Sequence, residues 1–384
     1  MRRVYFDYNA TTPVHPQVRE AILPFLGEEY GNPSSVHAVG ARARKALDDA
    51  RESVARHLKC GPREIVFTSG GTEANHLAIR GAAAVAFVAR GRRPVHVVTT
   101  AVEHSSVLKA FQVLEDEGQA QVTRLGVDSL GRVDFDALRA ALRDDTALVS
   151  VQSVNNETGN VYPVAEIGRL CRERGVLFHT DAVQALGKIP VDLSNLPVDL
   201  ASFSAHKIYG PKGSGALFVR KGIALSPLMP GVQEMEKRAG TENLPGIAGF
   251  AAAVDLVHRE PEKETARLDG LRGLFQQGLV RSIDGVRFHG DPDRRVANTL
   301  NVSFDGIADE TLLLSLDREG ICVSSGSACA SGAVEASHVL LAMGVPKAEA
   351  KGAIRFSLGR GSSEHDLEYV LEKLPSIVGR LRGL

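Results

Sequence analysis

The sequence predicts an α/β fold: a mostly parallel seven-stranded sheet with helices on both faces, joined to a smaller α+β domain. Short apolar runs alternate with helical patterns from about Ile65 to Val219, which is typical of such a sheet. After Pro245 the pattern changes to a long helical stretch followed by mixed elements. With 384 residues, the chain is long enough for two domains with sizeable cores.

The elements follow from the positions of the apolar runs. An amphipathic pattern predicts a helix over Ala38–Leu58, with GNPSS as the turn before it. We expect the domain boundary between Pro245 and Glu264, so that residues 13–255 form the large domain. Residues 1–12 and 256–384 would form the small one. The predicted strands begin near Ile65, Val95, Val122, Ala147, Val176, Leu200 and Gly215.

Composition argues against several classes of protein. The 45 basic and 46 acidic residues give a net charge of −1, which offers no general attraction to nucleic acid or membranes. No apolar stretch follows Arg2 and Arg3, and none elsewhere is long enough for a membrane span, so a soluble, cytoplasmic protein is expected. The four cysteines show no CxxC pair and no histidines at zinc-ligand spacing, so neither disulfides nor a metal site is expected.

Lys207 is the first candidate for chemistry, because it follows the apolar run Asp199–Phe203. An ordinary lysine has a pKa of about 10.4, and burial at the end of a strand would lower it and free the amine to attack an aldehyde. The alternative is a solvated cation in a loop. No second lysine is apparent in a comparable position at a strand end.

Asp181 follows a second apolar run, Val176–Phe178, and should lie at the carboxyl end of a strand, the edge where open α/β sheets bind ligands. An aspartate there could keep the ring nitrogen of pyridoxal phosphate protonated. The alternative interpretation is a helix N-cap.

Two further segments fit such a cofactor. Ser69–Thr72 lies between the run Ile65–Phe67 and a helical pattern, so its backbone N–H groups could bind a phosphate, although a plain turn is also possible. His104 follows the run Val95–Val98, and its flat ring could stack on the ring of a cofactor. A structural histidine is the alternative.

Motifs along nearly the whole chain resemble those of one family, in the same order. They are YFDYNATTPVHP, GNPSSVH, FTSGGTEANHLAI, EHSSV, VNNETGNVYPV, HTDAVQALGKIPVD, SFSAHKIYGPKGSGAL, RAGTENLPGI, SSGSACASG and IRFSLGR. On these residues the chain is identified as a member of the pyridoxal-phosphate-dependent cysteine desulfurases of the class V aminotransferase superfamily. The resemblance implies the fold-type I architecture of these enzymes.

The resemblance also implies roles for single residues. Asn155 and Gln184 would bind the ring hydroxyl of the cofactor, and Asn155 the substrate as well. Ser204 and His206 would bind the phosphate together with the backbone of Gly71 and Thr72. Thr241 would reach the phosphate of the neighbouring subunit, which implies a homodimer. Arg355 would hold the α-carboxylate of the substrate, for which the planar fork of arginine is well suited.

Cys329 decides which reaction the resemblance implies. It lies in a loop, Val323–Ala333, that contains only Val, Ser, Gly, Ala and Cys, so little apolar area holds the loop to a core and we expect it to be mobile. An inert thiol in a linker is the alternative for Cys329. Cys322, earlier in the chain, is predicted to be a buried strand residue.

The implied reaction converts L-cysteine to L-alanine. Lys207 would remove the Cα proton, His104 would carry a proton near the substrate thiol, and Cys329 would take the sulfur as a persulfide. The acceptor would be an iron–sulfur scaffold or a transfer-RNA thiolase, and the sequence does not distinguish them. Alternatives are a selenocysteine lyase, a class V aminotransferase, which would have no use for Cys329, and a cofactor-free sulfur carrier.

Overall fold

The computed structural model describes residues 2–308, 310–325 and 335–383. Its largest element is a seven-stranded sheet in the order β2-β8-β7-β6-β5-β3-β4, in which β8 alone runs antiparallel to its neighbours. The fold class predicted from the sequence is therefore confirmed. The strands are β2 (Ile65–Thr68), β3 (Val95–Thr100), β4 (Ala120–Leu125), β5 (Thr146–Ser150), β6 (Leu177–Asp181), β7 (Leu200–Ser204) and β8 (Gly215–Val219).

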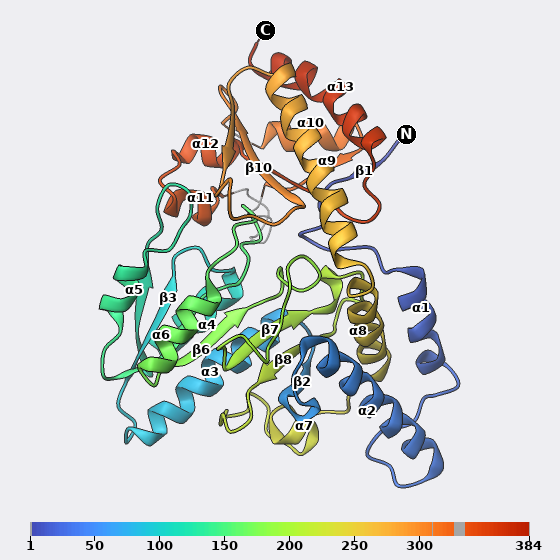
Figure 1. Ribbon diagram of the computed structural model, residues 1–384, viewed down its shortest axis with the longest axis vertical. Helices are drawn as coiled ribbons and strands as arrows, with labels where there is room; N and C mark the ends of the chain where they lie inside the picture. Colours follow the sequence, from blue (N-terminus) through green and yellow to red (C-terminus); the bar gives the residue numbers. More distant parts are fainter. Residues whose placement is uncertain (1, 309, 326–334, 384) are drawn as a thin grey trace.

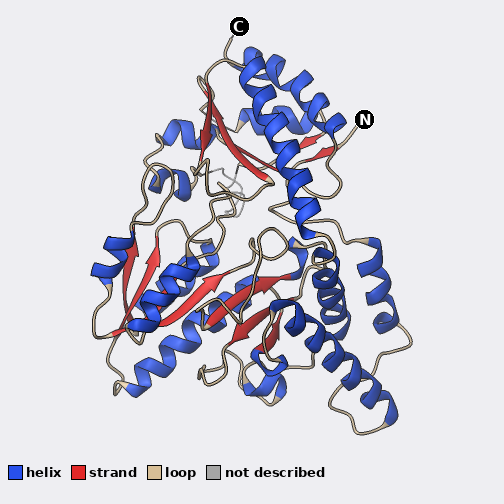
Figure 2. Cartoon of the chain, in the orientation of Figure 1, coloured by secondary structure: helices blue, strands red, loops and turns tan. Residues whose placement is uncertain are grey.

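Helices cover both faces of this sheet (Figures 1 and 2). Successive strand residues alternate between two cores: Phe67 and Val98 face one, while Val66 and Val97 face the other. Strands buried on both faces read as continuous apolar runs, which is why the sequence revealed them. The helices are α1 (Pro16–Ile22), α2 (Ala38–Leu58), α3 (Gly71–Ala89), α4 (Ser105–Asp116), α5 (Phe135–Ala141), α6 (Val164–Glu173), the short α7 (Gln233–Glu236) and α8 (Leu244–Val257), with 3-10 turns η1 (Leu23–Leu26), η2 (Pro62–Glu64) and η3 (Ala205–Lys207).

A separate core joins the two ends of the chain. The N-terminal β1 (Val4–Tyr5) pairs with β11 (Ile321–Cys322), and Val4 and Phe6 pack among C-terminal residues. In Figure 1 the blue N-terminal strand accordingly lies among the orange and red elements. The remaining elements are α9 (Pro261–Ser282), β9 (Val286–His289), β10 (Thr299–Phe304), α10 (Thr311–Arg318), α11 (His338–Ala342), α12 (Lys347–Gly352), β12 (Ile354–Ser357) and α13 (Glu364–Leu381).

Several expectations can be compared with these elements. All seven strands form where the apolar runs predicted them, and the helix Ala38–Leu58 has the predicted bounds. The division at residue 255 stays a prediction. Val339 and Leu340 of α11 pack into the larger core although they lie near the C-terminus, so no single position in the sequence separates the cores. In the described part of the chain, no helix has the length and apolar character to cross a membrane.

Candidate functional site

Asp181 is the last residue of β6, at the carboxyl edge of the sheet. Its side chain is buried, with one oxygen accepting a hydrogen bond from Nδ2 of Asn75 at 2.7 Å and the other from the backbone N–H of Val183 at 3.0 Å. Both partners fix the direction of the carboxylate. A cationic ring nitrogen placed here would meet an oriented acceptor, and the pairing of Asp181 with a protonated pyridine stays a prediction.

His104 is the N-cap of α4, and the capping contact determines how its ring can exchange protons. Nδ1 accepts from the backbone N–H of Ser106 at 3.2 Å, and the Ser106 hydroxyl lies 2.8 Å from the same nitrogen. Because Nδ1 acts as an acceptor, proton exchange is confined to Nε2. Burial lowers the pKa of His104, while the nearby Asp181 carboxylate opposes that shift.

A cradle for an anion lies beside Asp181, where the long helix α3 begins at Gly71. A Cβ on Gly71 would come within 2.6 Å of the Val183 side chain, so only glycine fits this close approach. The hydroxyl of Ser204 at the end of β7 is buried there without a hydrogen-bond partner. A buried orphan hydroxyl beside a helix N-terminus and Thr72 fits the phosphate of pyridoxal phosphate.

Lys207 follows β7 in the turn η3, next to the strand that ends at Asp181. Its amino group donates to the backbone carbonyls of Asn9 at 2.6 Å and Ala10 at 2.7 Å. The neighbouring His206 ring lies 3.1 Å from the Thr11 hydroxyl, and burial lowers the pKa of His206 to about 4. Both residues therefore face the N-terminal segment of the chain.

The two amides predicted at the ring hydroxyl have different surroundings. Asn155 is fully buried, with its oxygen accepting from the backbone of Glu157 and Thr158 and its Nδ2 donating to Val102 at 3.0 Å. These contacts leave one N–H of Asn155 for a ligand. Gln184 donates from Nε2 to the Asn9 carbonyl at 2.9 Å, also with one N–H to spare.

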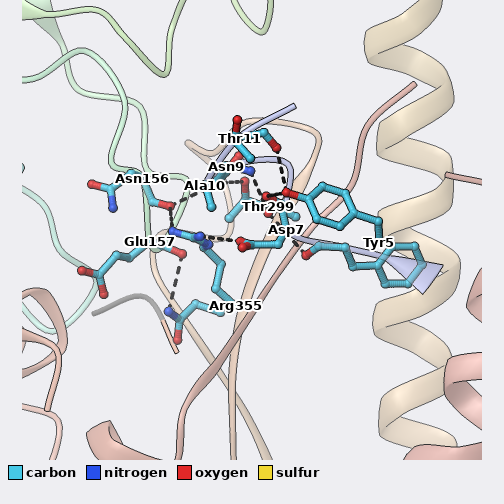
Figure 3. A network of polar contacts seen from close by, with 12 residues as sticks. Tyr5, Asp7, Asn9, Ala10, Thr11, Asn156, Glu157, Thr299 and Arg355 are labelled. Atoms are coloured by element: carbon cyan, nitrogen blue, oxygen red, sulfur yellow. Dashed lines mark hydrogen bonds and ion pairs between the residues drawn. The ribbon is translucent and has the colours of Figure 1, made fainter. Parts of the chain in front are cut away.

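Arg355 lies across the site on β12 and is almost fully buried. One terminal nitrogen pairs with Asp7 at 2.7 Å and the other donates to the Asn156 carbonyl at 3.0 Å, while its buried Nε has no hydrogen-bond partner (Figure 3). The guanidinium is held in place yet retains donors, which fits the binding of a carboxylate.

Two predicted residues lie away from these contacts. Thr241 is exposed on the single chain. The segment before it is tied to the anion cradle, because Arg238 pairs with Glu73 at 2.8 Å and Glu73 accepts from the backbone of Ser69. Cys329 and most of its predicted mobile loop lie outside the described residues. Cys322 is in a strand as predicted, but it is only half-buried.

The sequence interpretation missed four residues that complete the site: Asp7, Asn9, Asn75 and Lys188. Asn75 lies one helical turn after Gly71, a spacing that could have revealed it. Lys188 does not follow a strand end as Lys207 does, but it brings a second amino group to the site: its Nζ lies 2.7 Å from Oδ1 of Asn9, whose carbonyl binds Lys207. No group of three or more possible metal ligands occurs among the described residues.

The chain is similar to known proteins in both sequence and fold. Residues 4–370 match the family model described as aminotransferase class-V. A relative from Dictyoglomus turgidum named cysteine desulfurase IscS is 47% identical over all of this chain and 96% of its own length. A solved NifS-like protein is 39% identical with a TM-score of 0.91, covering 99% of this chain and 100% of the other. A structure titled SspA in complex with cysteine is 35% identical with a TM-score of 0.81, covering 92% of this chain and 98% of the other.

Proposed function

The chain belongs to the class V aminotransferase family and is a pyridoxal-phosphate-dependent cysteine desulfurase, and we propose that it captures the sulfur of L-cysteine as a persulfide on Cys329. The assignment of the site rests mainly on the meeting of Asp181, Ser204 and Lys207 at one edge of the sheet. These side chains supply a carboxylate, an unpaired hydroxyl and an amine to one place, as this cofactor requires.

Pyridoxal phosphate supplies an aldehyde carbon that links to amines and a protonated ring that accepts electrons from the attached carbon. We assign Asp181 as the partner of the ring nitrogen. Asn75 and Val183 orient its carboxylate by donating hydrogen bonds to it. The cradle between α3 and β7 would hold the phosphate, and the remaining N–H groups of Asn155 and Gln184 would bind the ring hydroxyl. The residues assigned to the phosphate are Gly71, Thr72, Ser204 and His206, with Thr241 from the neighbouring subunit.

Lys207 acts as the base in this proposal. Its amine takes the Cα proton of the substrate, and the carbonyls of Asn9 and Ala10 hold the resulting ammonium. His104 would stack on the ring and exchange a proton with the substrate through Nε2, because Nδ1 is occupied by Ser106. Arg355 holds the α-carboxylate with the donors that Asp7 and Asn156 leave available, and Asn155 contacts the substrate beside it.

Sulfur capture is the step assigned to Cys329. Its thiolate attacks the substrate sulfur, so an S–S bond forms as the C–S bond breaks. The electron pair of the C–S bond stays on the substrate carbon, which takes up a proton and becomes the methyl group of alanine. The other three thiols are almost fully protonated at neutral pH, because burial raises the pKa of Cys60 and Cys171 to about 12 and also raises that of Cys322.

The proposed reaction needs two kinds of partner, a second subunit and an acceptor for the sulfur. We assign the chain to a cytoplasmic homodimer, in which the exposed Thr241 of each subunit would reach the site of its neighbour. The persulfide passes to an acceptor protein, either an iron–sulfur scaffold or a transfer-RNA thiolase. A pull-down of the protein charged with L-cysteine, read out by persulfide transfer, would identify which.

Replacing Cys329 by serine tests the capture step. The Cys329→Ser holoenzyme should still bind cofactor and respond spectrally to L-cysteine, yet release almost no alanine. Mass spectrometry of the wild-type protein should show one added sulfur on the Cys329 peptide, and Cys322→Ser is the matched control, expected to turn over normally. Normal alanine release by Cys329→Ser, or added sulfur on Cys322, would contradict the proposal. Alanine formed without any keto acid distinguishes desulfuration from transamination.

A further inference from the structure

Lys188 brings a second amino group to the site. It lies in the turn after β6 and is half-buried. Its amino group donates to Oδ1 of Asn9 at 2.7 Å and also to Oε1 of Gln184. Lys188 and Lys207 line the same cleft between the two cores, and the carbonyl and side chain of Asn9 bind one lysine each. Lys188 therefore contacts a residue assigned to the cofactor without itself having a role in the proposed reaction.

The contacts of Gln184 fix which way its amide faces. Oε1 accepts from Lys188, and Nε2 donates to the carbonyl of Asn9 at 2.9 Å. If the amide were turned over, its NH2 group would face the N–H bonds of Lys188 and its oxygen would face the Asn9 carbonyl oxygen. Both contacts would then be repulsive, so the amide has one favourable orientation. In this orientation the remaining hydrogen-bonding capacity of Nε2 is a donor.

We propose that Lys188 is a positioning residue that holds the Gln184 amide with its N–H side toward the ring oxygen of the cofactor. The inference rests on the proposed function, which places Gln184 at that oxygen. An oxygen that accepts hydrogen bonds is stabilised by an N–H and repelled by a carbonyl oxygen, so a turned amide would weaken cofactor binding. Asn9 is held independently by Asn298, whose Nδ2 lies 3.1 Å from Oδ1.

Lys188 can donate to both of its partners with or without a charge. Burial of the amino group, together with the charges of Lys207 and Arg355, lowers the pKa of Lys188 well below its usual value. A neutral amine still has two N–H bonds, enough for both Asn9 and Gln184. A neutral amine also has a lone pair that can accept from a turned amide, so Lys188 fixes the orientation of Gln184 most strongly when it carries its proton.

A double-mutant cycle on cofactor affinity tests the inference. Equilibrium dialysis of the full-length, cofactor-free protein against pyridoxal phosphate gives a dissociation constant without any turnover. Lys188→Met should raise this constant about tenfold, the order expected for the loss of one hydrogen bond to a charged or strongly polar group. Gln184→Ala should raise it similarly, and adding Lys188→Met to Gln184→Ala should change it less than about twofold, because the two residues act as one unit.

Controls separate this role from folding and from the assignment of Gln184. Lys45→Met removes an exposed lysine paired with Asp49 and should leave the dissociation constant unchanged. If Lys188→Met fails to fold, as judged by circular dichroism, Gln184→Leu is compared with Lys188→Met/Gln184→Leu, in which both polar partners become apolar. Equal affinities of these two proteins support the inference, and a further loss contradicts it.

The outcomes are distinct. The positioning role of Lys188 is overturned if Lys188→Met has wild-type cofactor affinity. It is also overturned if Lys188→Met weakens cofactor affinity equally in the wild-type and the Gln184→Ala backgrounds. Either result leaves the proposed function intact. Wild-type affinity in Gln184→Ala removes Gln184 from the ring oxygen, which is a failure of the proposed site, and the role of Lys188 falls with it.

Discussion

At the floor of the site, Asp181, Ser204 and Lys207 are placed by the ends of neighbouring strands, whereas at the rim Arg355 is placed by Asp7, 348 residues away in sequence. The positions of the floor residues are set by strand ends of one sheet and the turn that follows β7, while Asn75 orients Asp181 and the Asn9 and Ala10 carbonyls hold the Lys207 amine. The rim depends on side chains that meet only after the two ends of the chain have docked. The difference teaches that the residues assigned to the cofactor lie at the edge of one sheet, whereas binding of the substrate carboxylate depends on how the two ends of the chain pack together.

The largest effect is expected from removing the floor lysine. Lys207→Ala should reduce alanine formation to trace level, because the amine at the end of β7 is lost and the nearby amine of Lys188 is bound to Asn9 and Gln184. Borohydride treatment of the wild-type holoenzyme should attach the cofactor to the Lys207 peptide, and mapping by mass spectrometry checks this. Lys212→Ala, an exposed lysine in the same loop, is the control. Substantial turnover in Lys207→Ala would mean that Lys207 is not the base.

Asp181→Asn should keep the fold and bind cofactor but lose most of its turnover. A neutral amide does not hold the proton on the ring nitrogen, and a close charge pair at an effective dielectric near 20 is worth up to about 4 kcal/mol, or about three decades in rate. The kcat for alanine release measures the loss. A kcat near that of the wild type would mean that the charge of Asp181 does not contribute to catalysis.

Arg355→Lys should act on the substrate rather than on the cofactor. Lysine keeps the charge but loses the fork that reaches Asp7, Asn156 and a carboxylate together, so KM for L-cysteine should rise by about tenfold or more. Cofactor affinity should stay unchanged, which separates the rim from the floor. Equal losses in cofactor affinity and KM would mean that the two regions are not distinct.

Asp7→Asn should give a smaller change at the same place. The amide still offers an oxygen to Arg355, but the hydrogen bond is no longer charge-assisted, so KM should rise about threefold with kcat little changed. Steady-state kinetics on L-cysteine measures both constants. A fall in kcat alone would assign Asp7 to the chemical step instead of the rim.

The smallest effect concerns His179 in the sheet below the site and the pH dependence of the free energy of unfolding. His179 on β6 is buried between the hydroxyls of Ser150 and Ser202, and burial lowers its pKa to about 3. Between about pH 6.5 and 3 the unfolded chain takes up a proton that the folded chain does not, so stability present above pH 6.5 is lost as pH falls. At pH 5 this loss is about 2 kcal/mol. His179→Gln should therefore lose less free energy of unfolding between pH 8 and 5 than the wild type, as urea titrations would measure, and an identical loss would contradict the shift.

Much of the floor could be predicted because it follows from local patterns. Apolar runs ending at Asp181 and Ser204 mark strands buried on both faces, and parallel strands bring their carboxyl ends to one edge. Gly71 was predicted by its place between a strand and a helix. The partners that hold these residues were not predicted: nothing in the sequence near Asp181 indicates that Asn75 orients it, although the helical spacing after Gly71 places Asn75 on the right face.

The sequence by itself therefore determined the sheet, its ligand-binding edge and the residue types on that edge, because strand and helix periods are local properties of the chain. Only the tertiary structure decided that Asn9 binds both Lys188 and Lys207, and that Asp7 holds Arg355. Those contacts join segments far apart in sequence, and they form when β1 pairs with β11 and brings the N-terminal segment over the site. No local period encodes such a meeting, since it depends on how the two cores pack around one another.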